Sequence, residues 1–402
     1  MSRPLRFLTV GSLALVPMVL ALACGDDTQV TLPKDGGADA TLSAETGPTP
    51  DAAVDAPAST CGIVIPTTYD SPQYDQNAAD ELALRARFDA LTQPMKDIES
   101  ALADAGAPPA LTAAQLRALD IAGTPNLKGV TTASYQAKVD AWFDDYEAGL
   151  GAGAYTPADP PTTGGSYGKY IMNARGVDLR QAIEKGLYVA AFYNHALAAV
   201  AAGAPTEATV DKLVAAWGAH PSFQNNQNAT QNKDVNSAGY AARRDSKDPL
   251  KPGPYQRGKA ALIKAKASIA AGAKCNADRD AALKAFFAEW EKATYATVVF
   301  YYADIVAKLS VGSPDYPGIL HSWGESLGFV AGFKGLPQDK RIITDAQIDA
   351  LLAKTYGADP IQGYKLVTAS IEAAGKLTSA TADIKAIYGF SDAEMESFKK
   401  NF

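Results

Sequence analysis

The sequence predicts an all-α fold of helical bundles preceded by a disordered N-terminal tether. Apolar residues recur at spacings of three, four and seven along several long stretches, which is the period of an amphipathic helix. Convincing alternation of period two is confined to a short extended piece at 63–65. The chain has 402 residues, 47% of them hydrophobic, so it can bury a large core. We expect residues 61–402 to form an all-helical globular domain, either as one body or as two packed bundles.

The first 23 residues have the features of a bacterial lipoprotein signal peptide. Arg3 and Arg6 precede an apolar run that ends abruptly at 25–27, and this run is too short to predict a membrane-spanning helix. The run closes with Ala-Leu-Ala-Cys at 21–24, which resembles a lipobox. We expect acyl chains such as palmitate on Cys24 to hold the protein on the periplasmic face of the envelope or on the outer membrane. An ordinary secretory signal is the alternative.

Residues 24–60 predict a flexible acidic tether. Ala, Asp, Gly, Pro and Thr dominate this stretch, which therefore cannot offset the entropy of ordering. The whole chain has a formal charge of −7, and most of that charge lies in the tether. The remainder has no run of Lys or Arg, which argues against a nucleic-acid partner. The expected partners are the membrane, through the lipid anchor, and other envelope proteins.

The cysteine count predicts one disulfide. The chain has three cysteines, and lipidation would use Cys24. Cys61 and Cys275 then remain as an even pair in an oxidising compartment, where they are expected to form a disulfide. Two unrelated thiols are the alternative.

In the first half of the folded part, apolar residues at helical spacing predict five helices. In the first of them Pro94 is expected to cause a kink or a break. Pro221 ends the last, because proline disfavours helical geometry in the residue before it. The Gly-, Pro- and Thr-rich segment 150–168 and the polar segment 224–238 predict loops. The expected helices are 76–105, 112–120, 132–149, 179–202 and 206–217.

The second half predicts two long helices and several shorter ones. The long helices cover 255–272 and 276–309, and Asn276 or Asp278 can cap the second. Its apolar stripe is typical of a bundle helix and consists of Leu283, Phe287, Trp290, Thr294, Tyr301, Ile305 and Leu309. The remaining expected helices are 318–333, 344–355, 359–376, 379–387 and 391–400.

The stretch 318–333 contains the main candidate site. His321 and Glu325 are four residues apart, so on a helix they lie one turn apart on the same face. Gly328 and Gly332 continue this face and would leave a groove without side chains. Imidazole and carboxylate at this spacing can bind a divalent metal such as iron or zinc. The alternative is a buried histidine that the glutamate orients without any metal.

Two further places carry candidate residues. Glu184 and His195 lie on one flank of the 179–202 helix, about 16 Å apart along its axis, so only one of them can join His321 and Glu325. The second place is the Arg-Arg-Asp sequence that precedes the 255–272 helix. It predicts a structural ion pair or, alternatively, an anion site, and its residues are Arg243, Arg244 and Asp245.

Several of these motifs resemble the imelysin-like proteins, in particular a branch known only as a domain of unknown function. The resemblance covers roughly residues 65–400 and rests on Gly-x-x-His-x-x-x-Glu at 318–325, a Gly-Phe pair at 328–329, Ala-Ile-Glu-Lys-Gly-Leu at 182–187 and Arg-Arg-Asp at 243–245. It implies an exported helical protein with a link to iron uptake and a disputed metallopeptidase activity.

We therefore expect a membrane-anchored envelope lipoprotein that binds a metal ion or a metal-bearing ligand through His321 and Glu325, helped by Glu184 or His195. The alternative is a non-catalytic structural or interaction lipoprotein. A metallopeptidase is less favoured, because the sequence has no His-Glu-x-x-His and its three histidines lie far apart.

Overall fold

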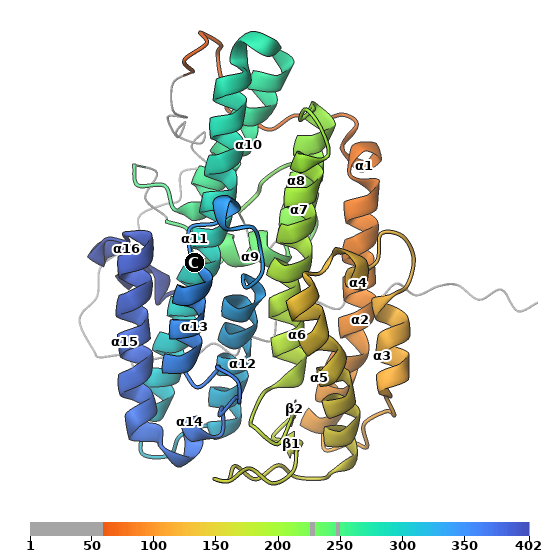
Figure 1. Cartoon of the computed structure of the whole chain (residues 1–402), viewed down its shortest axis with the longest axis vertical. Coiled ribbons are helices and arrows are strands. Elements are labelled where there is room, and N and C mark those ends of the chain that lie inside the picture. Colours follow the sequence, from red (N-terminus) through yellow and green to blue (C-terminus); the bar gives the residue numbers. More distant parts are fainter. Residues whose placement is uncertain (1–58, 226–229, 247–249, 402) are drawn as a thin grey trace, which may run out of the picture. The chain divides into compact units, whose positions relative to one another are not determined.

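The computed structural model describes residues 59–225, 230–246 and 250–401, and this part of the chain is nearly all α-helical, as predicted (Figure 1). A π-helical stretch, Tyr188–Tyr193, joins α6 to α7. The α-helices are α1 (Tyr74–Asn77), α2 (Ala79–Ala103), α3 (Ala113–Asp120), α4 (Leu127–Val130), α5 (Ala133–Gly151), α6 (Leu179–Leu187), α7 (Asn194–Ala201), α8 (Glu207–Trp217), α9 (Asn236–Arg243), α10 (Pro254–Ala270), α11 (Asn276–Leu309), α12 (Tyr316–Gly332), α13 (Asp345–Lys354), α14 (Lys365–Thr368), α15 (Ser370–Tyr388) and α16 (Asp392–Phe398).

The predicted loop at 150–168 runs into a small hairpin. Strands β1 (Gly165–Tyr167) and β2 (Tyr170–Met172) pair antiparallel, with Ser166 opposite Ile171. Gly168 takes the positive φ of 58° that the two-residue turn requires. Strands of three residues are too short to show a period of two, so this hairpin could not be predicted from the pattern of apolar residues.

Several helix predictions need correction. The expected helix 359–376 begins only at Lys365 and is divided at Ala369 into α14 and α15. Of the kink or break predicted at Pro94, the break does not occur, because the buried neighbours Leu91 and Met95 keep α2 on the core. The predicted break before 379 is also wrong, since α15 runs unbroken through it and Thr378 bonds back to the carbonyl of Ala374. Helix α9 was not predicted, because the sequence that leads into it, 224–238, is rich in polar residues.

Helices α6 and α12 approach each other almost backbone to backbone. A β-carbon at Gly328 would lie 2.8 Å from the carbonyl oxygen of Ala182, and one at Gly332 would lie 2.9 Å from that of Gly186. Only glycine permits so close an approach. The side-chain-free groove predicted beside His321 is therefore wrong, since the backbone of α6 fills it.

The long helix α11 packs against α10, α12 and α15 and so ties the two ends of the domain together (Figure 1). At its centre Trp290 is fully buried and lies near Trp217 of α8, with 6.5 Å between the ring centroids. The stripe predicted for 276–309 is buried from Leu283 to Ile305. This helix is the support on which α12 is held.

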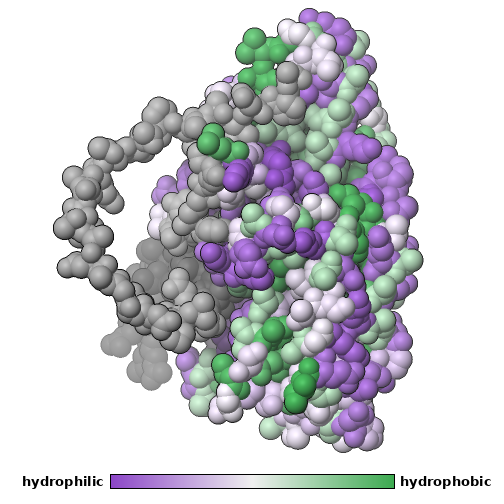
Figure 2. Space-filling model, turned by 90° about the vertical axis from the view of Figure 1, so that its left-hand side faces the viewer, coloured by the Kyte–Doolittle hydropathy of each residue, from purple (hydrophilic) through white to green (hydrophobic). Residues whose placement is uncertain are grey.

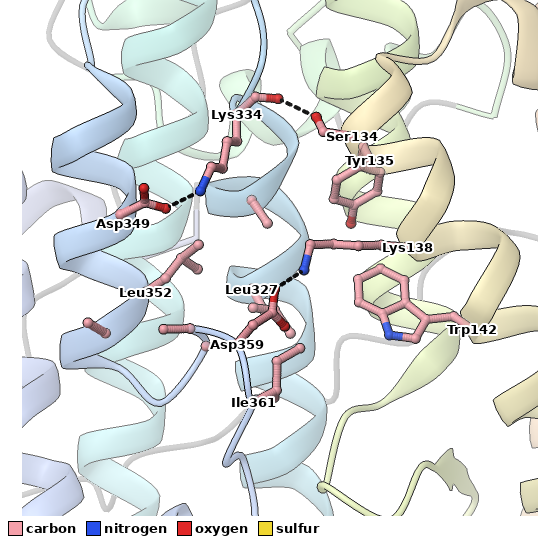
Figure 3. A pocket seen from close by; sticks show the side chains of 14 residues that line it. Ser134, Tyr135, Lys138, Trp142, Leu327, Lys334, Asp349, Leu352, Asp359 and Ile361 are labelled. Atoms are coloured by element: carbon pink, nitrogen blue, oxygen red, sulfur yellow. Dashed lines mark hydrogen bonds and ion pairs between the residues drawn. The ribbon is translucent and has the colours of Figure 1, made fainter.

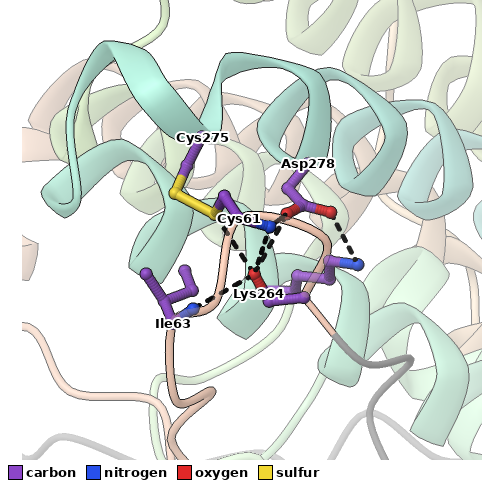
Figure 4. Close-up of a disulfide and its surroundings, with 6 residues drawn as sticks. Cys61, Ile63, Lys264, Cys275 and Asp278 are labelled. Atoms are coloured by element: carbon purple, nitrogen blue, oxygen red, sulfur yellow. Dashed lines mark hydrogen bonds and ion pairs between the residues drawn. A yellow bond between two sulfur atoms is a disulfide. The ribbon is translucent and has the colours of Figure 1, made fainter.

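The predicted disulfide is confirmed (Figure 4). Cys61 and Cys275 are bonded, with their Cα atoms 5.4 Å apart. The backbone N–H of Cys61 also donates to Asp278 of α11 at 3.0 Å, and Lys264 of α10 pairs with the same carboxylate at 3.2 Å. The start of the described chain is thus fastened to the α10–α11 corner by one covalent bond and a group of polar contacts.

The predicted signal peptide, Cys24 and the tether as far as residue 58 lie outside the described residues. Among the helices described between residues 59 and 401, none is long and apolar enough to cross a membrane. On the face shown in Figure 2, outside the grey atoms, hydrophilic and hydrophobic residues are intermixed, and the strongly hydrophobic ones form small separate groups.

Substituting Gly328 by alanine tests the close packing of α6 and α12. The added methyl group would meet α6 backbone at 2.8 Å, so we expect Gly328→Ala to lower the free energy of unfolding in urea by about 1–3 kcal/mol. Gly375→Ala is the matched control, because nothing lies within 4 Å of that site on α15. Helix propensity alone should make it up to about 1 kcal/mol more stable. Equal effects of the two changes would contradict the packing.

Candidate functional site

His321 and Glu325 both face α6, but they take different partners there. Nδ1 of His321 lies 2.8 Å from Oδ2 of Asp178, at the N-terminus of α6. Oε1 of Glu325 lies 3.3 Å from Nζ of Lys185, two turns further along that helix. The spacing therefore placed both side chains on the correct face, while their partners come from the neighbouring helix.

Asp178 holds His321 in one orientation. This aspartate is fully buried, and its Oδ1 caps α6 by accepting from the backbone N–H of Gln181 at 3.1 Å. On the other side of the imidazole, Nε2 lies 3.3 Å from the side-chain amide of Gln181. The Tyr170 ring stacks on the imidazole, with 4.1 Å between the centroids. With Nδ1–H donated to Asp178, the Nε2 lone pair accepts from the amide.

The surroundings of His321 favour its protonated form. Burial lowers the pKa of His321, but the hydrogen bond to Asp178 and the negative charges of Glu325 and Asp178 outweigh burial and raise the pKa above 6.5. Oε1 of Gln181 is buried without a hydrogen-bond partner. Turning this amide over would let that oxygen accept from Nε2–H of an imidazolium, so the same residues can hold either form of the ring.

Lys185 occupies the space between two of the predicted site residues. Its Nζ lies 2.8 Å from Oε1 of Glu184 and 3.3 Å from Oε1 of Glu325. The rings of Tyr188 and Tyr240 lie under the same ammonium, with centroids at 5.5 and 5.0 Å. A divalent cation that bridged the two glutamates would need this position, which the protein fills with a cation of its own.

Arg180 extends the network towards α2. It pairs with Glu99 at 2.6 Å and with Glu184 at 2.9 Å, and Lys96 lies 3.7 Å from Glu184. Burial raises the pKa of Glu184, but Lys185, Lys96 and Arg180 outweigh it and hold the pKa well below its usual value. These buried charges neutralise one another across α2, α6 and α12, which favours a structural role for the network.

His195 lies away from this network. Its Nε2 is 3.0 Å from Oε1 of Glu81 on α2. The four predicted metal ligands, His321, Glu325, Glu184 and His195, are therefore not brought together at one point. Within the residues that the structure describes, no group of three or more His, Cys, Asp or Glu side chains is placed to hold a metal ion.

The Arg-Arg-Asp sequence helps to hold the C-terminal end of the chain. The buried Arg244 donates to the carbonyl oxygens of Phe398 and Lys400, both at 2.8 Å. Asp245 accepts from the Asn225 amide at 3.0 Å, and burial raises its pKa to about 6. The Arg243 guanidinium lies over the Tyr240 ring, 5.1 Å from its centroid. These contacts favour the structural interpretation over an anion site.

A groove with a volume of about 400 Å³ lies on a neighbouring face of α12 (Figure 3). Its floor is Leu327 and Ala331 of α12, and its walls are α5, α13 and the loop 357–361. A second hollow of about 450 Å³ adjoins it and shares several of its residues, Lys138, Trp142, Asp359 and Ile361. Sequence analysis missed this site, because its lining comes from segments far apart in the chain.

Two ion pairs lie at the rim of this groove. Lys138 of α5 pairs with Asp359 of the loop at 2.8 Å, and Lys334 pairs with Asp349 of α13 (Figure 3). The aromatic ring of Trp142 lies on the α5 side. The groove therefore combines apolar surface with charges of both signs, as small-molecule sites do.

Comparisons with protein-family models, curated proteins and solved structures gave no match. The resemblance to imelysin-like proteins therefore stays a prediction.

The raised pKa of His321 predicts a dependence of stability on pH. Protonated His321 stabilises the fold below pH 6.5, and this stabilisation is lost as the pH rises through the higher folded pKa. In urea unfolding from pH 5 to 9, the stability advantage of the wild type over His321→Gln should shrink as the pH rises.

Titrating groups whose pKa does not depend on His321, such as Asp245, cancel in this comparison. Glu99 does not cancel, because the charge of His321 lowers its pKa. Asp178→Asn removes the partner that raises the pKa and should flatten the dependence in the same way. Parallel curves for the wild type and His321→Gln would show that His321 is not protonated preferentially in the folded state.

Proposed function

We propose that this protein is a lipid-anchored lipoprotein of the bacterial cell envelope that binds a ligand without converting it chemically. The observation that carries the export part of the proposal is the Cys61–Cys275 disulfide. Structural disulfides form in oxidising compartments, and this one follows directly after the predicted tether. Export across the inner membrane would then account for the signal peptide, for the acylation of Cys24 and for the disulfide in the helical domain.

The position of the disulfide suits a domain held by its N-terminus. Tension from an anchor would reach the fold at Cys61 and would pass through the covalent bond to Cys275, which precedes α11. Without that bond, non-covalent contacts such as those of Ser59 and Cys61 with Asp278 would have to resist peeling of the first described residues. The position of this disulfide therefore supports a domain that is attached to the membrane through its N-terminal segment.

The buried charges support a structural role for His321 over a catalytic one. Asp178 and Lys185 meet His321 and Glu325 from α6, and these pairs join the two helices. Breaking such a buried pair costs about 3–5 kcal/mol, so the network is suited to hold a scaffold. The metal-binding form of the proposal is disfavoured, because Lys185 fills the position between Glu184 and Glu325.

Expression of the full-length chain in a bacterial host with a lipoprotein pathway tests anchoring. The wild type should sediment with membranes and incorporate a palmitate analogue, whereas Cys24→Ser should do neither, because the acylated thiol is missing. In both proteins Cys61 and Cys275 should resist alkylation until they are reduced. A cytosolic protein with two reactive thiols would contradict the proposal.

Metal analysis tests the role of His321. Mature protein purified without chelators should contain no stoichiometric iron or zinc, because the Lys185 ammonium already lies between the two glutamates. Its thermal midpoint should not change on treatment with a chelator. Stoichiometric metal that is lost in His321→Ala but kept in the control Gly375→Ala would instead establish the metal-binding function.

A further inference from the structure

We propose that the groove between α5, α12 and α13 binds a small zwitterion with an apolar side chain. The chemistry is an ammonium, a carboxylate and a hydrophobic group, as found in a hydrophobic amino acid or in a short peptide made of such residues. This inference rests on the proposed binding function and names its site and ligand class.

The apolar surface of the groove defines one part of the ligand. Leu327 and Ala331 form the floor, Trp142 and Ile361 stand at one end and Leu352 lies on the opposite wall (Figure 3). A volume of about 400 Å³ lies within the range of small-molecule sites. An aliphatic or aromatic side chain that enters here replaces contact with water by contact with these residues.

The charges at the rim define the other part. Lys138 and Lys334 face Asp359 and Asp349, so the groove has equal numbers of positive and negative side chains. The adjoining hollow repeats this balance with Arg175 and Asp145 among its lining residues. A ligand with one charge of each sign matches this arrangement, whereas a purely anionic or cationic ligand leaves charges of one sign without a partner.

The Lys138–Asp359 pair is the contact that the ligand would exchange. It joins the α5 wall to the loop 357–361, and its side chains are 32% and 74% exposed. An ion pair so open to solvent contributes little to stability, so it can open at small cost. The ligand carboxylate then binds the ammonium of Lys138, and the ligand ammonium binds Asp359. Lys138 and Asp359 thus each keep a partner of opposite charge, and the ligand connects α5 with the loop 357–361.

Isothermal titration of the mature, full-length protein with L-leucine and with L-leucyl-L-leucine tests this proposal and separates the amino acid from the peptide. At least one of them should bind. N-acetyl-L-leucinamide, which has the same side chain and neither charge, should bind at least about tenfold more weakly, because charge-assisted hydrogen bonds are lost. Lys138→Met should weaken binding of the zwitterion to the same extent and leave the neutral analogue unaffected.

Two variants locate the binding event. Ala353→Trp adds a large ring to an exposed lining position and should abolish binding. Lys385→Met is the matched control, since it opens an exposed ion pair with Asp392 outside the groove, and it should leave the affinity unchanged. Circular dichroism confirms that each variant is folded.

Absence of binding of both zwitterions at millimolar concentration would overturn the proposal. Binding that Ala353→Trp and Lys138→Met leave intact, or equal affinity for the neutral analogue, would overturn it as well. These outcomes are independent of membrane fractionation, so a failure of this inference can be told apart from a failure of the anchored-lipoprotein function.

Discussion

The contact between α6 and α12 is the constraint on which the rest of the structure depends. Glycines at 328 and 332 let the two backbones meet, since any β-carbon there would lie within 3 Å of α6 atoms. Helices this close leave no room for long side chains between them. The charged residues must then lie along the margins of the contact, where Asp178 reaches His321 and Lys185 reaches Glu325.

That geometry explains why the charges are tolerated in the interior. A buried ammonium without partners costs several kcal/mol, and Lys185 avoids this cost through two carboxylates and two aromatic rings. The opposing charges also set one register of α12 against α6, because a shift by a turn would separate both pairs. The helix that sequence analysis singled out for ligand binding therefore serves first to fix the fold.

The neighbouring face of α12 is available for a different purpose. Leu327 and Ala331 lie on this neighbouring face and form the floor of the groove. The rigid contact behind them holds this floor in place, while α5 and the loop 357–361 supply the walls. The disulfide at Cys61 fastens the start of the described chain to the α10–α11 corner instead, so this attachment and the groove use separate elements.

Local patterns in the sequence were enough to determine the helical class, the positions of most long helices and the placement of His321 and Glu325 on one face. The period of apolar residues and the number of cysteines are properties of the chain alone, and they correctly predicted α11 and the Cys61–Cys275 bond. Only the tertiary structure decided the partners. Asp178 lies 143 residues from His321 along the chain, and no periodicity reports which helix will face a glycine stripe. The backbone of α6 fills the space that was predicted for a ligand. The groove lies elsewhere, where three segments that are distant in the sequence meet.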